Sequence, residues 1–164
     1  MRLKAPGRQV LVLALLASPL GVACDEATPP TAPAPLPSPT PSPARVYPGP
    51  ETIALVAAFQ TQGRTARIVE VLPQESDPFF AVPAARLSVD GENVYSFEYL
   101  SPSEAEGEAS LISPEGTHIG STWITWVSDP HFYQSRSLIV LYVGTSPSLL
   151  RVLEQLLGPQ IAGA

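Results

Sequence analysis

The hydrophobic pattern becomes regular at residue 50, where it first predicts a helix. Pro50 and Glu51 are favoured in a first helical turn, and Gly63 suits the position just after a helix end. The residues that recur between them at helical spacing are Ile53, Val56, Ala57 and Gln60. The β-branched run 66–72 (ARIVEVL) then predicts a strand, and 73–83 a long loop.

Residues 86–99 predict a β-hairpin that turns at Asp90-Gly91. The apolar residues of the two arms are Leu87 and Val89 in the first and Tyr95, Phe97 and Tyr99 in the second. A two-residue turn would place these two sets on opposite faces of the sheet. We therefore expect a three-residue connection or a bulge, which would pair Leu87 with Tyr95 and bring both sets to one face.

Two further helices and two further strands follow the hairpin. Ser101-Pro102-Ser103-Glu104 matches a capping box and predicts a helix start, with an end at 114–116. Its expected apolar stripe is Ala105, Ala109 and Ile112. The runs 122–127 (TWITWV) and 138–143 (LIVLYV) predict strands. Ser146-Pro147 begins a last helix that ends at Gly158-Pro159, with these residues facing inward: Leu149, Leu150, Val152, Leu153, Leu156 and Leu157.

The order of these elements predicts an α+β fold for residues 50–164. Strands and helices do not alternate as they do in a parallel α/β sheet. We therefore expect a mainly antiparallel sheet of about five strands, with about three helices packed on one of its faces.

The first 23 residues have the pattern of an export signal. Arg2, Lys4 and Arg8 come before any acidic residue, and the uncharged run 10–20 is too short to span a membrane as a helix. Cys24, the only cysteine of the chain, follows at once. The pattern predicts a signal peptide over residues 1–23, and a lone cysteine excludes an internal disulfide.

Gly21-Val22-Ala23-Cys24 resembles the lipobox of bacterial lipoproteins. The resemblance implies that Cys24 carries a lipid and becomes the first residue after cleavage. Gly21 stands where that family usually has leucine, so simple secretion after cleavage at Ala23 and an uncleaved anchor remain alternatives. Attachment to the cell membrane or envelope would then depend on the Cys24 lipid, since two acyl chains anchor a protein stably.

Residues 24–49 read as a tether rather than as part of the domain. Half of the chain's 20 prolines lie between residues 29 and 50. Such a segment cannot bury enough apolar surface to fold and favours an extended, disordered spacer. A PxxP ligand for an aromatic groove is the alternative.

The charge of the chain excludes one class of partner. Once residues 1–23 are removed, six arginines face fifteen acids, a net charge of −9. A body this acidic lacks the basic surface that nucleic acids require. We therefore expect no nucleic-acid partner, but an envelope protein or a small ligand.

Residues that could support catalysis or metal binding are few. His118 and His131 lack further ligands at a zinc spacing, apart from Asp129 beside His131. No G-x-S-x-G nucleophile elbow or glycine-rich phosphate loop is present, and Glu104 is explained as a helix cap. We expect no metal and no cofactor.

An aromatic cluster is the strongest candidate for a ligand or partner cleft. Its members lie in two predicted connections beside strands: Phe79, Phe80, His131, Phe132 and Tyr133. Aromatic side chains with a histidine often line a binding cleft. The alternative is that they pack against an uncovered part of the sheet.

The span 78–158 resembles a group of uncharacterised bacterial lipoproteins. The residues that carry the resemblance include PFF (78–80), LSVDGENV (87–94), ISPEG (112–116), PHFY (130–133) and LIVLYVG (138–144). Those relatives commonly have Gly-Arg before the last strand, where this chain has Ser135-Arg136-Ser137. The resemblance implies location and fold class but no chemistry.

The sequence thus favours a non-catalytic lipoprotein whose domain binds a ligand or partner at the envelope. A hydrolase that uses His131 and a passive spacer are the alternatives.

Overall fold

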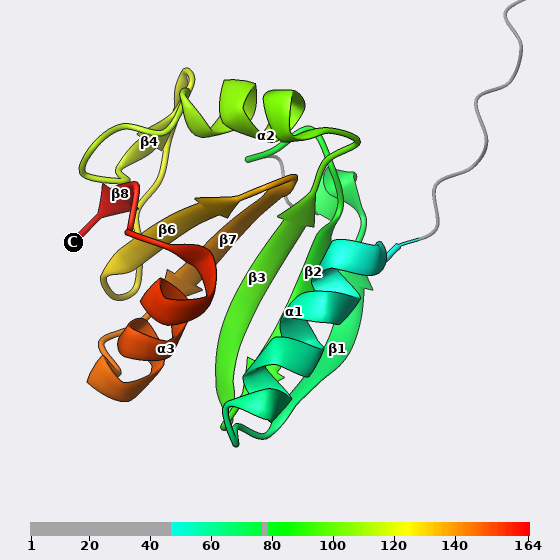
Figure 1. Cartoon of the computed structure of the whole chain (residues 1–164). Coiled ribbons are helices and arrows are strands. Elements are labelled where there is room, and N and C mark those ends of the chain that lie inside the picture. Colours follow the sequence, from blue (N-terminus) through cyan, green and yellow to red (C-terminus); the bar gives the residue numbers. More distant parts are fainter. Residues whose placement is uncertain (1–46, 77–78) are drawn as a thin grey trace, which may run out of the picture. The chain divides into compact units, whose positions relative to one another are not determined.

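The computed structural model describes residues 47–76 and 79–164, which form three α-helices, a six-stranded sheet and a two-stranded hairpin (Figure 1). The predicted signal peptide, Cys24 and most of the predicted tether lie outside the described residues. Within those residues, no helix is long and apolar enough to cross a membrane. The elements are α1 (Pro50–Thr61), β1 (Ala66–Leu72), the 3-10 turn η1 (Gln74–Ser76), β2 (Ala84–Val89), β3 (Glu92–Glu98), α2 (Pro102–Ala109), β4 (His118–Ile119), β5 (Thr122–Trp123), β6 (Pro130–Ser135), β7 (Leu138–Val143), α3 (Pro147–Leu157) and β8 (Ala162–Gly163).

The main sheet confirms the predicted α+β class. Its strand order is β1-β2-β3-β7-β6-β8, and every neighbouring pair is antiparallel. The sheet has six strands instead of about five, because β6 and the short β8 were not predicted as strands. β4 and β5 form a separate hairpin.

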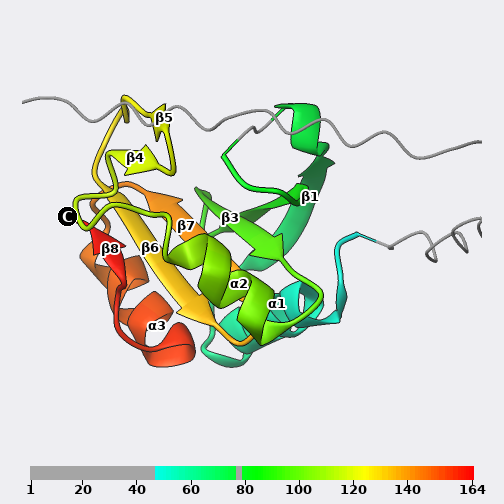
Figure 2. The same ribbon diagram turned by 90° about the horizontal axis from the view of Figure 1, so that it is seen from above.

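Both faces of the sheet are covered, which corrects the expectation of helices on one face. α1 and α3 lie on the first face, where Phe59, Leu87 and Leu153 belong to one buried cluster. On the second face, Ala105 of α2 is buried in another cluster with Phe97. Figure 2 shows β4 and β5 on the side of the sheet opposite α3 and α1. The sheet is therefore the middle layer of the domain.

The β2–β3 turn also differs from the prediction. Val89 pairs with Glu92 and Leu87 with Val94, so only Asp90 and Gly91 form the turn, and the expected irregularity is wrong. Both turn residues have positive φ, 52° and 92°, as two-residue hairpin turns of this kind require. The regular turn costs no burial, because each arm has a covered face on either side of the sheet.

Helix α1 has the predicted extent but a different inner face. Its buried residues are Thr52, Leu55, Val56 and Phe59. Ile53, predicted to face inward, is 53% exposed. Two polar contacts fix this orientation, since the backbone N–H of Thr52 donates to Glu98 Oε2 at 2.9 Å and its hydroxyl bonds to Ser96 Oγ at 2.9 Å.

Helix α2 begins as the capping box predicts. The backbone N–H of Glu104 donates to Ser101 Oγ at 3.3 Å, and the Glu104 carboxylate accepts from the backbone N–H of Leu100 at 3.0 Å. The helix ends at Ala109 and not at residues 114–116, because Ile112 pairs instead with Ile119 in a single β-bridge.

The remaining elements divide into confirmed and revised predictions. β1 and β7 have the predicted bounds, and α3 ends before Gly158, whose φ is 91°. Of the predicted strand 122–127, only Thr122–Trp123 is a strand. Residues 124–127 form an irregular segment on the second face, where they build one wall of the candidate site.

Candidate functional site

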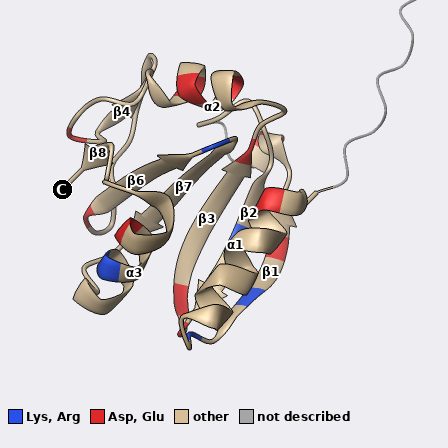
Figure 3. Ribbon diagram, in the orientation of Figure 1, with Lys and Arg blue, Asp and Glu red and all other residues tan. Residues whose placement is uncertain are grey.

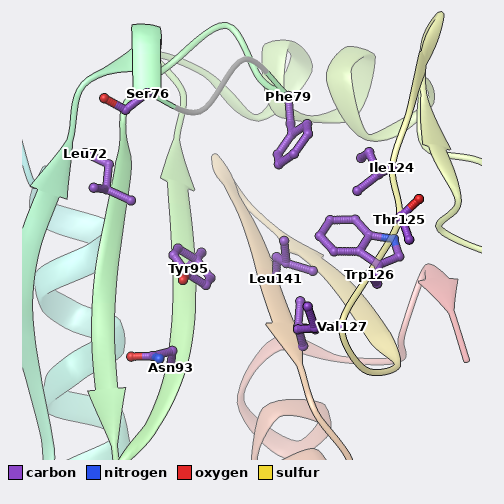
Figure 4. Close-up of a pocket in the computed structure, with 11 residues that line it drawn as sticks. Leu72, Ser76, Phe79, Asn93, Tyr95, Ile124, Thr125, Trp126, Val127 and Leu141 are labelled. Carbon is purple, nitrogen blue, oxygen red and sulfur yellow. The ribbon is translucent and has the colours of Figure 1, made fainter.

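A groove of about 450 Å³ lies on the second face of the sheet, beside the part that α2 and the β4–β5 hairpin cover (Figure 4). β3 and β7 form its floor, and the segment 124–127 and Phe79 form its walls. The lining residues are Leu72, Ser76, Phe79, Asn93, Tyr95, Ile124, Thr125, Trp126, Val127, Leu141 and Val143. A volume of this size lies in the range of small-molecule sites.

The floor follows from strand alternation. Tyr95 of β3 pairs directly with Leu141 of β7, so both side chains lie on the same face. Asn93 and Val143 lie two residues further along the same strands and extend that face. Because residues i and i+2 of a strand share a face, this surface follows directly from the antiparallel β3–β7 register.

Trp126 holds the wall of the groove in place. Its indole Nε1–H donates to the carbonyl oxygen of Gly116 at 2.6 Å. Its ring centroid lies 5.9 Å from that of Phe132 in the core and 5.9 Å from that of Phe79 across the wall. The backbone N–H of Ile124 also donates to Thr117 at 3.0 Å. These contacts make the aromatic wall part of the fold.

Among the described residues that line the groove, none is Asp, Glu, His, Lys or Arg. Ser76, Asn93, Thr125 and the Tyr95 hydroxyl are its polar groups. Arg86 donates to Oδ1 of the lining residue Asn93 at 3.3 Å and pairs with Glu70 at 2.8 Å. Since that pair balances its own charge, the groove suits an uncharged ligand.

The structure does not bring the five predicted aromatic-cluster residues around one cavity. Phe79 is partly buried and lines the groove. Phe80 and Phe132 are buried in the core of the second face, where the rings of Phe80 and Phe97 pack at a tilt with 4.6 Å between their centroids. His131 and Tyr133 alternate with Phe132 along β6 and so face the other side of the sheet.

We compared the chain with protein families, curated proteins and solved structures. None of them matches it. The resemblance to bacterial lipoproteins therefore stays a prediction, and the function has to be inferred from the sites themselves.

His131 is enclosed by groups of the fold. It is 5% exposed and stacks on Tyr142 with 5.9 Å between ring centroids. Its Nδ1 lies 2.8 Å from Gln160 Oε1, and its Nε2 lies 3.0 Å from the carbonyl oxygen of Gly144. In the described part of the chain, both ring nitrogens of His131 thus have partners within the fold.

Two further features bear on chemistry. Burial raises the pKa of the Tyr133 phenol, and the nearby Glu154 carboxylate adds to the shift. Among residues 47–76 and 79–164, no three His, Cys, Asp or Glu side chains gather to hold a metal ion.

Sequence reasoning missed most of the groove. Trp126, Tyr95 and Leu141 were assigned to strands without a site, because the floor depends on which strand lies beside β3. The sequence of residues 122–127 offered no signal for Trp126, because Trp126 and Val127 are both apolar and only the structure half-buries the first and exposes the second.

Proposed function

We propose that this protein is a lipid-anchored envelope protein whose domain binds an uncharged, largely apolar ligand in the groove. The observation that supports the proposal best is the groove itself, which combines a largely apolar floor, an aromatic wall and a few polar groups, with no Asp, Glu, His, Lys or Arg among its described lining residues. Ligand sites typically have this composition, with a few polar groups that orient the ligand.

The exposure of these residues also supports a binding role. Val127, at one end of the groove, is 99% exposed, and Trp123 beside the wall is 78% exposed. Each Å² of exposed apolar surface that a ligand covers contributes roughly 25 cal/mol to the free energy of binding. An apolar side chain this exposed at the mouth of a groove, as Val127 is, is available to a ligand.

A fluorescence titration tests the groove. The chain has two tryptophans, so a Trp123→Phe variant leaves Trp126 of the wall as the only one. We expect N-phenylnaphthylamine, an uncharged aromatic probe, to bind saturably and to quench Trp126 by energy transfer.

Two matched substitutions locate the bound probe. Val127→Lys places a charge at the groove, and Leu100→Lys makes the same change at a residue that is 75% exposed and does not line it. Val127→Lys should weaken binding about tenfold, or ~1.4 kcal/mol, and Leu100→Lys should leave it unchanged. Equal effects of both changes, or no saturable binding, would reject the groove as the site.

The anchor is tested separately at Cys24, which lies outside the described residues. Cys24→Ser should move the protein from the membrane fraction to the soluble fraction without changing its unfolding midpoint. Mass spectrometry should find diacylglyceryl on Cys24 in the host. An unmodified thiol would reject the lipid anchor and leave the groove proposal intact.

A further inference from the structure

A second cavity, of about 280 Å³, lies on the opposite face of the sheet from the groove, between α1, α3 and the β6–β7 turn. Its apolar walls are Ala54, Leu55, Ala58, Leu138, Leu156 and Leu157. Its polar lining residues are Glu51, Ser135 and Arg136. This volume is at the small end of ligand sites, so the cavity suits a small molecule.

The two charged residues of this cavity belong to different elements. Glu51 lies in the first turn of α1, and Arg136 in the β6–β7 turn; Figure 3 shows these segments red and blue. In the described part of the chain, the ion pairs within 4.0 Å are Arg64–Asp90 and Arg86–Glu70, so Glu51 and Arg136 do not pair with each other. Glu51 uses one carboxylate oxygen to accept the backbone N–H of Ser137 at 3.3 Å.

The backbone at Arg136 is strained. Arg136 has a φ of 52°, a left-handed conformation that costs an arginine of order 1 kcal/mol and that glycine adopts freely. Asp90 has the same φ, but its carboxylate accepts from Arg64 and from the backbone N–H of Thr65, both at 2.8 Å. These hydrogen bonds explain why an aspartate stands in the β2–β3 turn. The Arg136 guanidinium has no ion pair in the described part of the chain. The positive φ of Arg136 follows from the two-residue β6–β7 turn, since Ser135 pairs with Leu138, so it is the placement of the guanidinium beside the cavity that needs an explanation.

We propose that this cavity binds a small zwitterion with an apolar side chain, of the kind that a free aliphatic amino acid provides. The Arg136 guanidinium would take the carboxylate, because its planar donors match a carboxylate. The Glu51 carboxylate would take the ammonium, and the leucine and alanine walls would cover the side chain. The cavity has one acidic and one basic residue. A fatty acid would leave Glu51 without a partner of opposite charge, and an amine would leave Arg136 without one.

The ligand class can be tested by titrating the lipid-free protein with four probes, followed by amide NMR shifts. L-leucine carries both charges and the side chain, 4-methylpentanoate lacks the ammonium, isopentylamine lacks the carboxylate, and glycine lacks the side chain. We expect saturable shifts with L-leucine around Ala58 and Leu138, and affinities at least about tenfold lower for the other three probes. Equal binding of L-leucine and 4-methylpentanoate, or no saturable binding of L-leucine, would overturn the proposal.

Substitutions then assign the two charges. Arg136→Gln and Glu51→Gln should each weaken L-leucine binding about tenfold, and Arg136→Lys should retain part of it. Arg151→Gln is the control, since Arg151 is an exposed arginine of α3 that does not line the cavity. Unfolding midpoints near that of the parent would show that the variants fold. Unchanged affinity in a folded Arg136→Gln variant would overturn the assigned role of Arg136.

Discussion

The start of α1 depends on a carboxylate from the far end of β3. Glu98 is 4% exposed, and its two oxygens accept the backbone N–H groups of Thr52 at 2.9 Å and Glu51 at 3.3 Å. These are among the N–H groups that no helical carbonyl can reach. Gly49 lies so close that an added Cβ would overlap the Glu98 carboxylate. The start of α1 thus needs a long side chain with acceptor oxygens at position 98 and no side chain at position 49.

We predict that Glu98→Ala destabilises the domain by about 2–4 kcal/mol, because one strong and one longer bond to a charged acceptor are lost in a buried place. Glu98→Gln keeps one amide oxygen as acceptor and should cost less. Gly49→Ala should cost about 1–3 kcal/mol through the collision with the carboxylate. With a φ of −77°, Gly49 is in a conformation open to alanine, so the collision and not backbone strain is the expected cause.

The double variant separates the two causes. Without the carboxylate, Gly49→Ala has nothing of Glu98 to collide with and should cost at least about 1 kcal/mol less than in the parent. Urea unfolding of the four proteins at neutral pH gives the coupling free energy directly. If Gly49→Ala costs the same in both backgrounds, the contact with Glu98 is not what requires glycine there.

Three further predictions concern other parts of the domain. The Arg64 guanidinium, and then the backbone N–H of Thr65, lower the pKa of the Asp90 carboxyl below its usual 3.8, so its stabilising effect is present above that value and is lost as pH falls through the lower folded value. Asp90→Asn should therefore differ from the parent in urea midpoint at pH 6, and the difference should shrink as the pH falls below 3.8; a constant difference would contradict this. Ser101→Ala should cost about 0.5–2 kcal/mol in urea unfolding, because it removes the cap of α2, and no cost would mean that the cap is dispensable. Phe132→Ala should cost about 3–5 kcal/mol, and Phe79→Ala clearly less because Phe79 is only partly buried, so equal losses would place Phe79 in the core.

The sequence predicted those elements whose patterns are local. The β-branched runs of β1 and β7, the Ser101 cap and the Ser146-Pro147 start of α3 were read correctly because the signals lie within each element. The hairpin register was wrong for a non-local reason. The prediction assumed that Leu87 and Phe97 are buried on the same face of the sheet, and only an irregular turn would bring both to one face. Because α2 and the 122–127 segment cover the second face, apolar residues on both faces of the hairpin are buried and no irregular turn is needed. The hairpin sequence itself contains no sign of this second layer.

The candidate cleft shows the same limit. PHFY, read as an aromatic connection, forms most of β6, and strand alternation sends His131 and Phe132 to opposite faces. Only the pairing of β6 with β7 decides this, and the pairing cannot be seen from residues 130–133 alone. Phe79 lines the groove beside Trp126, with 5.9 Å between ring centroids, and this contact joins segments that lie far apart in the sequence.

The groove exists because the second face of the sheet is covered unevenly. The first face has α1 and α3, and α3 alone buries four residues against it. The second face has α2, a helix of eight residues that buries only Ala105. So short a helix packs against β6 and β7 but does not reach the Tyr95 part of β3, and the hydrogen bond from Trp126 to Gly116 holds the irregular wall beside that gap. The groove is thus the part of the second face, around Tyr95 and Leu141, that no helix lines.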